Sequence, residues 1–599
     1  MLAGKEITDA LILTNGNIID VSSGRIYKGD IFIAEGRIAR IDCPGGSNKG
    51  KNVIDVSGKY ISPGLIDSHL HIESSMLSPI EFSKEAVRHG TTTILVDPHE
   101  IANVCGRKGI ELFLSQSDLV PLDMFVGIPS CVPCTDLEDS GGNIGLEDIR
   151  QLIEDPRVYG LGEMMNFHGI IRGSGNAREK IDIVYEFGKV VDGHCPGLTG
   201  DDLRSYVSNG RNDGVLRIMS DHETTTADEA LEKYKAGMYV ALRYGSASKD
   251  LSRILPALLS KRNQKFDRFM LCSDDLDPIE LYEQGHVDRI VKRVRDIILE
   301  YSDSNLEQAT VFALSLATVN PAKYFSRFLQ FHCHPAIGQI EADKKANLVV
   351  FNSLEDLDVD TVLYNGRLVV DEGVYIGEDV EYDYSDFFGS VKVGRKLSPS
   401  DFRVSYSGNQ RTLTVKVIGV VEGCLNTELM ELPMEIHKGE IKAEAEDVAK
   451  IAVIERHKQS GSYSLGFVKG LGIRRGAVAS TVAHDSHNLI VVGVDDACMA
   501  KAANYLSQKG GGMVVVTDSE ISYFPLEIGG LMSTCGIEDV VDGYKKIIGS
   551  VKAVGSRLEN MFMTMSFLSL PVIPRLRITN KGLVDVDAFK FIELYGDAR

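Results

Sequence analysis

The stretch Gly64-Leu-Ile-Asp-Ser-His-Leu-His-Ile-Glu73 decides the fold. Apolar residues lead into it from Tyr60 and Ile61, which predicts a buried strand that ends at His69 and His71. Side chains two apart on a strand point to the same face, so the two imidazoles could hold one metal ion. The pair alone is weak evidence, because two histidines at a strand end can equally be making ordinary hydrogen bonds.

The stretch opens a region, residues 60–330, in which apolar strand patterns alternate with amphipathic helix patterns. Helices are expected over 79–89, 146–154, 226–236 and 286–301. Eight strand–helix units in about 270 residues predict an α/β fold of the (β/α)8 TIM-barrel type. An open doubly wound sheet is the alternative, but no glycine-rich nucleotide loop follows an early strand. The expected strands end near His71, Asp97, Pro129, Glu163, His194, His222, Arg243 and Asp274.

Both flanks of this region carry short strand patterns. Turn signals at Asn15-Gly16 and Glu35-Gly36 separate strands near the start of the chain. Similar patterns return at 346–351 and 361–370. We therefore expect residues 1–59 and 331–376 to form one small composite β-sandwich, into which the barrel is inserted. Residues 400–599 alternate differently, with a helix over 496–509, and predict a C-terminal α+β domain beyond a linker at 377–386.

Bulk composition excludes several classes of protein. A chain of 599 residues with 43% hydrophobic and 25% charged residues is typical of a globular protein with more than one domain. The formal charge of -21 argues against a nucleic-acid partner. We expect no membrane partner, because no apolar run is long enough to span a bilayer. The first residues lack the apolar core of a signal peptide, and the ten cysteines are scattered, so the cytoplasm is the expected compartment.

The expected strand ends carry an unusual set of side chains. In a barrel, the catalytic groups come from the carboxyl ends of several strands. Each of these residues alone could be structural, but four histidines and two carboxylates at strand ends predict a binuclear metal site. The six candidate ligands are His69, His71, Glu163, His194, His222 and Asp274.

This pattern resembles the amidohydrolase superfamily over about residues 1–375. The runs 63–75 and 97–106, the segment Ser220-Asp-His-Glu223 and the extra C-terminal domain resemble the adenine deaminase family in particular. The resemblance implies two divalent ions, Mn first and Fe or Zn as alternatives. It implies that His69, His71 and Asp274 hold one ion, that His194 and His222 hold the other, and that Glu163 bridges them. It also implies adenine as the small-molecule substrate, hypoxanthine and ammonia as products in purine salvage, and a homo-oligomer.

Further residues are expected around the substrate. Asp274 can accept a proton from the attacking hydroxide and pass it to the leaving ammonia, and Glu223 can protonate the ring nitrogen N1. Glu223 could equally be an ordinary carboxylate at a helix start. His99 is a second pocket candidate. The C-terminal segment 480–488 carries two more, His484 and His487, which we expect near the mouth of the barrel or, equally, on a polar surface loop.

Three alternatives compete with this interpretation. His71 and Glu73 with Cys131 and Cys134 nearly reproduce the H-x-E…P-C-x-x-C signature of cytidine-deaminase-type zinc enzymes, but the proline and cysteine are not adjacent. A related enzyme that opens cyclic amides is a second alternative, against which Glu163 in place of a lysine argues. A non-catalytic protein on the same barrel is the third, and the complete ligand set argues against it.

Overall fold

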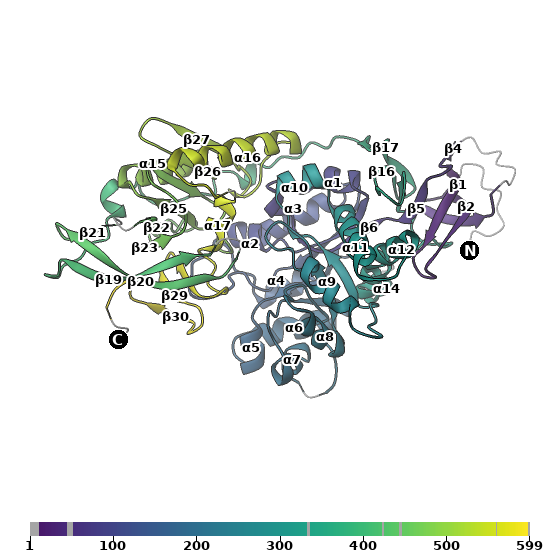
Figure 1. Ribbon diagram of the computed structural model, residues 1–599, viewed down its shortest axis with the longest axis horizontal. Helices are drawn as coiled ribbons and strands as arrows, with labels where there is room; N and C mark the ends of the chain where they lie inside the picture. The colour runs from purple at the N-terminus through teal and green to yellow at the C-terminus, as the bar shows by residue number, and fades with distance from the viewer. Residues whose placement is uncertain are drawn as a thin grey trace.

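A computed structural model describes residues 11–44, 52–211, 213–331, 336–421, 424–442, 446–558 and 560–596. Three parts lie in a row: a small sheet near the N-terminus, a central barrel and a C-terminal domain (Figure 1). The residues on which the signal-peptide expectation rests, 1–9, lie outside the described part. Among the described residues, no helix is both long and apolar enough to cross a membrane.

The central part is a closed parallel barrel, which confirms the predicted fold class. Strand β14 (Asp274–Asp275) continues the last strand and pairs with the first, Asp274 opposite Leu70. On the other side of the barrel, the Met219 N–H donates to the Val191 carbonyl at 3.1 Å and joins the fifth strand to the sixth. The eight strands are β6 (Leu65–His71), β7 (Thr91–Val96), β8 (Asp123–Ile128), β9 (Val158–Met164), β10 (Val190–Gly193), β11 (Ser220–Asp221), β12 (Tyr239–Arg243) and β13 (Phe269–Cys272).

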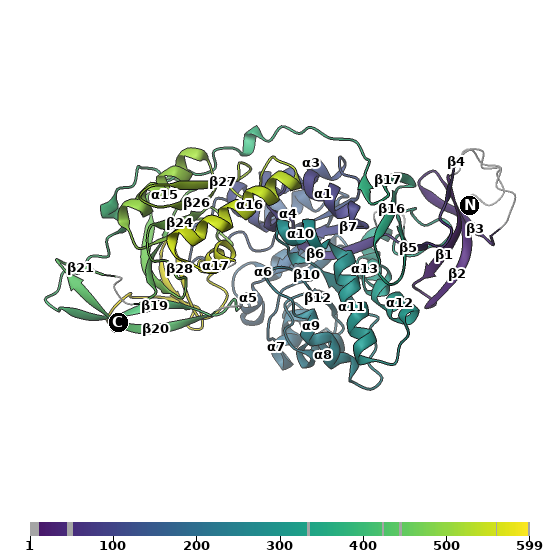
Figure 2. The same ribbon diagram turned by 45° about the horizontal axis from the view of Figure 1, so that its top comes forward.

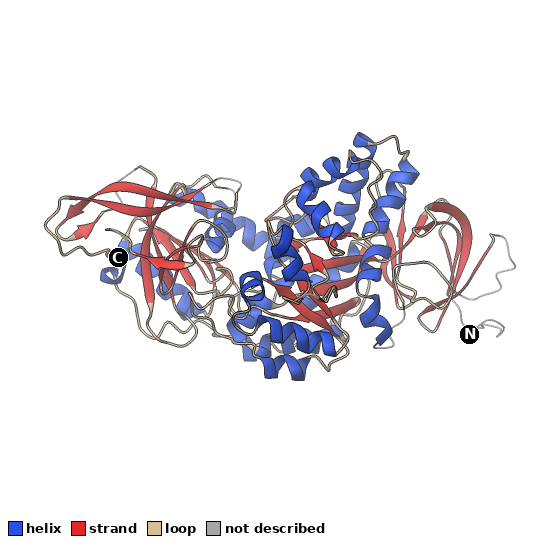
Figure 3. Cartoon of the chain, turned by 90° about the horizontal axis from the view of Figure 1, so that it is seen from below, coloured by secondary structure: helices blue, strands red, loops and turns tan. Residues whose placement is uncertain are grey.

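Helices surround these strands (Figure 3). The strands are buried on both faces, as in β7, where every residue is buried, including the three threonines that precede Ile94, Leu95 and Val96. Local signals set where helices begin: the Ser78 side chain accepts from the Glu81 N–H, and Thr226 does the same for Glu229. The longer helices are α1 (Pro79–Arg88), α3 (Arg107–Ser117), α6 (Ala177–Glu186), α7 (Gly200–Val207), α8 (Ala227–Lys235), α9 (Leu251–Leu259), α11 (Val287–Tyr301) and α12 (Leu306–Leu316).

The small sheet is built from both flanks of the barrel. Strand β5 (Tyr60–Pro63) pairs antiparallel with β15 (Leu348–Phe351), so the chain enters and leaves the barrel through neighbouring strands. Leu13, Ile18 and Val350 share one buried core. The remaining strands are β1 (Leu11–Asp20), β2 (Arg25–Ala34), β3 (Arg37–Asp42), β4 (Asn52–Asp55), β16 (Val359–Tyr364), β17 (Arg367–Asp371) and β18 (Val374–Tyr375).

The C-terminal domain is organised by a nine-stranded sheet in the order β21-β20-β19-β23-β22-β25-β24-β26-β27. The predicted helix is α15 (Asp496–Lys509), and α16 (Ile537–Val551) and α17 (Met561–Phe567) follow it. The sheet strands are β19 (Thr412–Val420), β20 (Thr427–His437), β21 (Glu440–Ile441), β22 (Val448–Ile454), β23 (Tyr463–Lys469), β24 (Ala477–Ser480), β25 (Leu489–Gly493), β26 (Gly512–Val516) and β27 (Ile521–Pro525).

This domain covers the edge of the barrel at which the strands end. The connecting chain runs along the barrel, where the Tyr382 hydroxyl lies 2.7 Å from the Ser115 hydroxyl (Figure 2). Helix α2 (His99–Cys105) directly follows β7, and its Ile101 belongs to the same buried cluster as Leu526 and Ile528 of the C-terminal domain. The two parts are therefore joined through a common apolar core at the carboxyl ends of the strands.

Candidate active site

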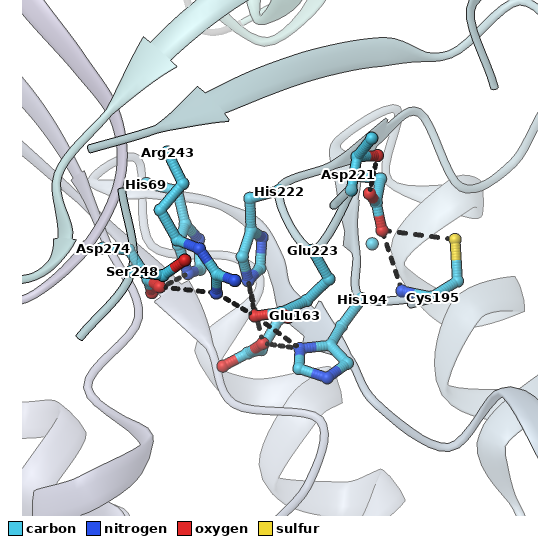
Figure 4. A network of polar contacts seen from close by, with 12 residues as sticks. His69, Glu163, His194, Cys195, Asp221, His222, Glu223, Arg243, Ser248 and Asp274 are labelled. Carbon is cyan, nitrogen blue, oxygen red and sulfur yellow. Dashed lines mark hydrogen bonds and ion pairs between the residues drawn. The ribbon is translucent and has the colours of Figure 1, made fainter. Parts of the chain in front are cut away.

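The six predicted ligand residues meet in one buried pocket at this edge. Figure 4 shows Glu163 beside His194 and His222, with Arg243 next to Asp274. They come from five different strand ends, so they are brought together only because the barrel closes. His69 and His71 end β6, Glu163 lies in β9, His194 follows β10, His222 follows β11 and Asp274 begins β14.

His69 and His71 have their outer nitrogens held by acceptors. The Nδ1 of His69 lies 2.8 Å from Asp192 Oδ2, and the Nδ1 of His71 lies 2.9 Å from the Asp97 carbonyl oxygen. A carbonyl and a carboxylate can only accept, which places a proton on each Nδ1, so in the neutral ring Nε2 carries a lone pair. The two Nε2 atoms lie 3.2 Å apart. Two lone pairs that converge in this way repel unless a cation lies beside them, so the pair fits a metal ion.

Glu163 lies between the two histidine groups. Its Oε2 is 2.5 Å from His194 Nδ1 and 3.2 Å from His222 Nε2, and its Oε1 is 3.6 Å from His71 Nε2. The Glu163 N–H donates to Asp97 Oδ2 at 2.8 Å, which fixes the backbone at the strand end. Burial alone would raise the pKa of Glu163, but His194 and His222 hold it well below its usual range. The carboxylate is thus ionised and shared between both sides of the pocket.

Asp274 and Glu223 are linked by Arg243, a residue that the sequence pattern predicts only as the end of a strand. Arg243 Nη1 donates to Asp274 Oδ2 at 2.9 Å and also contacts Glu223 Oε1. Glu223 Oε1 is 3.8 Å from His222 Nε2, so its side chain turns into the pocket although it directly follows a ligand in the sequence. Asp274 has a φ of 57°, a strained conformation for a residue that is not glycine. This turn aims its carboxylate at His71 Nε2, 3.3 Å away.

The pocket favours positive charge. Burial would lower the pKa of His194 and His222, but nearby carboxylates, Glu163 first among them, outweigh it and raise the pKa of His194 to about 9 and that of His222 to about 8. Imidazoles that need a proton to balance buried carboxylates mark a place where a cation is stabilised. The donors, imidazole nitrogens and carboxylate oxygens, fit a divalent metal centre.

Asp192 and Asp97 are the positioning residues that sequence reasoning missed. Asp192 stands two before His194 in the chain, and its side chain reaches His69 across the barrel. The position of Asp192 two residues before His194 could have identified it from the sequence. Side chains two apart on a strand point to the same face, so both point into the barrel. The sequence predicts Asp97 only as a strand end and as the first residue of a run that resembles the adenine deaminase family, with no role in holding a ligand.

The three predicted substrate histidines lie where the C-terminal domain meets α2. His99 Nδ1 is 3.2 Å from Glu163 Oε1, and His99 Nε2 is 3.9 Å from Asp485 Oδ1. His484 Nδ1 lies 3.0 Å from Glu100 Oε1 and its ring stacks on Phe567 at 4.5 Å. His99 thus touches the ligand set, whereas His484 faces α2.

His487 is held within its own segment. Its Nδ1 accepts from the Ala483 N–H at 3.2 Å, and its Nε2 lies 3.7 Å from Glu100 Oε2. With Nδ1 accepting, the neutral ring carries its proton on Nε2, so His487 is a hydrogen-bonded residue of the domain contact.

Cys131 and Cys134, the cysteines of the alternative zinc signature, are thiols. Burial, helped by Glu163, raises the pKa of the Cys131 thiol, and burial with Glu138 raises that of Cys134. The thiolate is the form that binds metal, so neither residue is prepared as a ligand.

Known proteins are similar to this chain over both its barrel and its C-terminal domain. The amidohydrolase family matches residues 60–369, and the adenine deaminase C-terminal domain matches residues 425–590. A protein named adenine deaminase from Methanothrix thermoacetophila is 38% identical over 98% of both chains. One from Thermosipho africanus is 39% identical over 99% of this chain and 98% of its own. One from Brucella suis biovar 1 is 39% identical over 98% of this chain and 95% of its own. With both halves matched in this order, the chain belongs to the adenine deaminase family of the amidohydrolases.

Proposed function

We propose that this enzyme hydrolyses adenine to hypoxanthine and ammonia. The observation that carries the proposal is the meeting of four histidines, Glu163 and Asp274 in one buried pocket of a chain that matches adenine deaminases over nearly its full length. The reaction needs a strong nucleophile at neutral pH and a group that carries protons from water to the departing amine.

The proposed centre holds two divalent ions. His69, His71 and Asp274 would hold one ion, His194 and His222 the other, and Glu163 would stand between them. Mn is the first candidate by family resemblance, and Fe and Zn suit the same donors. Bound ions supply one thing to the chemistry, the acidification of water that makes a nucleophile available near pH 7.

The chain's own residues move the protons in this proposal. Asp274 accepts a proton as water attacks C6 of the purine, and it returns the proton to the departing ammonia. Glu223 delivers a proton to N1 as C6 becomes tetrahedral, and it regains a proton from the C6 hydroxyl as ammonia leaves and the carbonyl of hypoxanthine forms. Arg243 contacts both carboxylates and so fixes their separation. His99, against Glu163, is proposed to border the substrate, and His484 and His487 are proposed to hold the wall that the C-terminal domain supplies.

The test is ammonia release from adenine by protein reconstituted with Mn, Fe or Zn, with metal-free protein as control. Activity that depends on the metal supports the proposal. Opening of a cyclic imide without ammonia release would replace it with the cyclic amide hydrolase. Protein that binds no metal and turns over neither substrate would point to the non-catalytic alternative.

Two further expectations are a homo-oligomer, which rests on the family resemblance, and a cytoplasmic location, for which the scattered cysteines argue. Light scattering during size-exclusion chromatography measures the first, and fractionation of cells measures the second. A monomer at all concentrations would contradict the homo-oligomer.

A further inference from the structure

A small cavity lies where the barrel meets the C-terminal domain. The barrel contributes Glu73, Ser74 and Asp275 to its lining, and the C-terminal domain contributes His484, Met563 and Phe567. Asp275 directly follows Asp274, and one oxygen from each of these carboxylates and a ring nitrogen of His71 all lie within 4.8 Å of one another. The cavity therefore adjoins the proposed metal centre and extends from it toward the C-terminal domain.

Glu73 lines this cavity and carries a carboxyl oxygen without a hydrogen-bond partner among the described residues. The residue is 3% exposed. Its Oε1 accepts from the Ile101 N–H at 3.1 Å, which fixes the carboxyl group, whereas its Oε2 has no hydrogen-bond partner among the described residues. A buried carboxyl oxygen without a hydrogen-bond partner is costly, and a ligand N–H would remove that cost.

The other walls suit a flat aromatic ligand. Met76, Met563 and Phe567 are apolar, and the Phe567 ring already stacks on another ring, that of His484. The cavity has a volume of about 30 Å³ in this closed form, little more than a water molecule needs. A purine must therefore displace side chains, and helix α17, which is rich in methionine, can yield because methionine changes rotamer easily.

We propose that Glu73 recognises the ring N–H of the free purine base and so makes the site specific for bases over nucleosides. The proposal rests on adenine deamination as the function. When C6 faces the ligand residues, the five-membered ring points away from them, and its N–H, at N9 in the common tautomer, is the donor available at the far end. A nucleoside carries its sugar on N9 and offers no donor there. In sites built to bind a substrate N–H, kcat/KM for an analogue without that N–H is typically lower by a factor of roughly 10⁴–10⁵.

Glu73→Gln tests this assignment. A glutamine keeps an oxygen for the Ile101 N–H but turns an N–H₂ group toward the ligand. The variant is compared with wild-type enzyme on adenine and on 9-methyladenine, with metal content and Tm measured in parallel. The matched control is Glu138→Gln, because Glu138 is also 3% exposed with an unpartnered Oε2 but does not line the cavity.

In the wild type we expect kcat/KM for adenine to exceed that for 9-methyladenine by at least ~10³-fold. In Glu73→Gln this ratio should fall at least tenfold, mainly because kcat/KM for adenine decreases. Glu138→Gln should leave the ratio unchanged. An unchanged ratio in folded, metal-loaded Glu73→Gln would overturn the assignment. Glu73→Asp, which withdraws the oxygen, replaces the glutamine variant if that protein does not fold.

A measurement without turnover separates this inference from the proposed function. Hypoxanthine and 9-methylhypoxanthine are titrated calorimetrically into the wild-type holoenzyme. Much tighter binding of hypoxanthine supports recognition of the N–H, and equal affinities overturn it. Wild-type enzyme that releases no ammonia from adenine would instead refute the proposed function.

Discussion

At the scale of single residues, Asp274 carries the proposed proton transfer. Its Oδ1 faces His71 and its Oδ2 accepts from Arg243, so one carboxylate meets both the ligand set and a fixed cation. Asp274→Asn keeps an oxygen for the metal but cannot take a proton. We expect kcat for adenine to fall by roughly 10²–10⁴-fold while most of the metal remains. A near wild-type kcat at matched metal content would refute the role.

Asp192 should act only through His69. Its carboxylate holds the Nδ1–H of that ring, which fixes the tautomer and keeps Nε2 free for a metal. Asp192→Asn should weaken metal affinity by about 10–100-fold, because an amide holds the ring less firmly. Competition with a chelator measures this, and excess metal should restore most of the activity. Loss of activity at saturating metal, with unchanged affinity, would contradict the positioning role.

At the scale of elements, the segment between β24 and β25 packs against helix α2. His484 lines the cavity, whereas His487 bonds to its own segment through the Ala483 N–H. His484→Gln should therefore lower kcat/KM for adenine at least tenfold, about 1.4 kcal/mol of transition-state stabilisation. His487→Gln should instead destabilise the fold by about 1–3 kcal/mol, because it disturbs a buried hydrogen bond.

These two histidine variants are compared by steady-state kinetics and calorimetry. Unchanged kinetics in His484→Gln would remove the segment from the substrate site. A kinetic loss in His487→Gln as large as in His484→Gln would show that the two rings act together.

At the scale of the whole molecule, the ion pair of His484 and Glu100 joins the C-terminal domain to the barrel. Burial would lower the pKa of His484, but Glu100 outweighs it and raises the pKa to about 9. Burial would raise the pKa of Glu100, but His484 outweighs it and lowers the pKa. A histidine whose pKa is raised from 6.5 contributes stability fully below pH 6.5 and loses it as pH rises through about 9. Glu100, whose pKa is lowered, contributes stability at every pH above its unfolded pKa. This contribution is lost only when the pH falls into the acid range.

The Tm difference between wild type and His484→Gln should therefore be largest near pH 6 and shrink steadily toward pH 9.5. His487 is the internal control, because burial holds its pKa well below the usual value and its ring stays neutral over this range. The Tm difference for His487→Gln should stay flat. A constant difference for His484→Gln across the same pH range would show that the contact between the domains does not depend on this charge.

The ligand pattern could be predicted from sequence because it is local. Apolar runs that end in His71, Glu163 or Asp274 mark strand ends, and a parallel barrel brings all strand ends to one edge whatever the loops between them do. Helix α15 was predicted for the same kind of reason, since periodicity and its glycine end, Gly510, lie within the segment. These features depend on residues a few positions apart.

Only the tertiary structure decided the partners of those residues. Asp192 reaches His69 over 123 positions, Arg243 joins Asp274 to Glu223, and Glu100 meets His484 from another domain. No spacing encodes such contacts, because they depend on barrel closure and on where the C-terminal domain packs. The free oxygen of Glu73 is likewise invisible in a sequence. The sequence pattern therefore determined which side chains meet at the strand ends. Tertiary packing determined which partners hold each side chain and which groups face the proposed substrate.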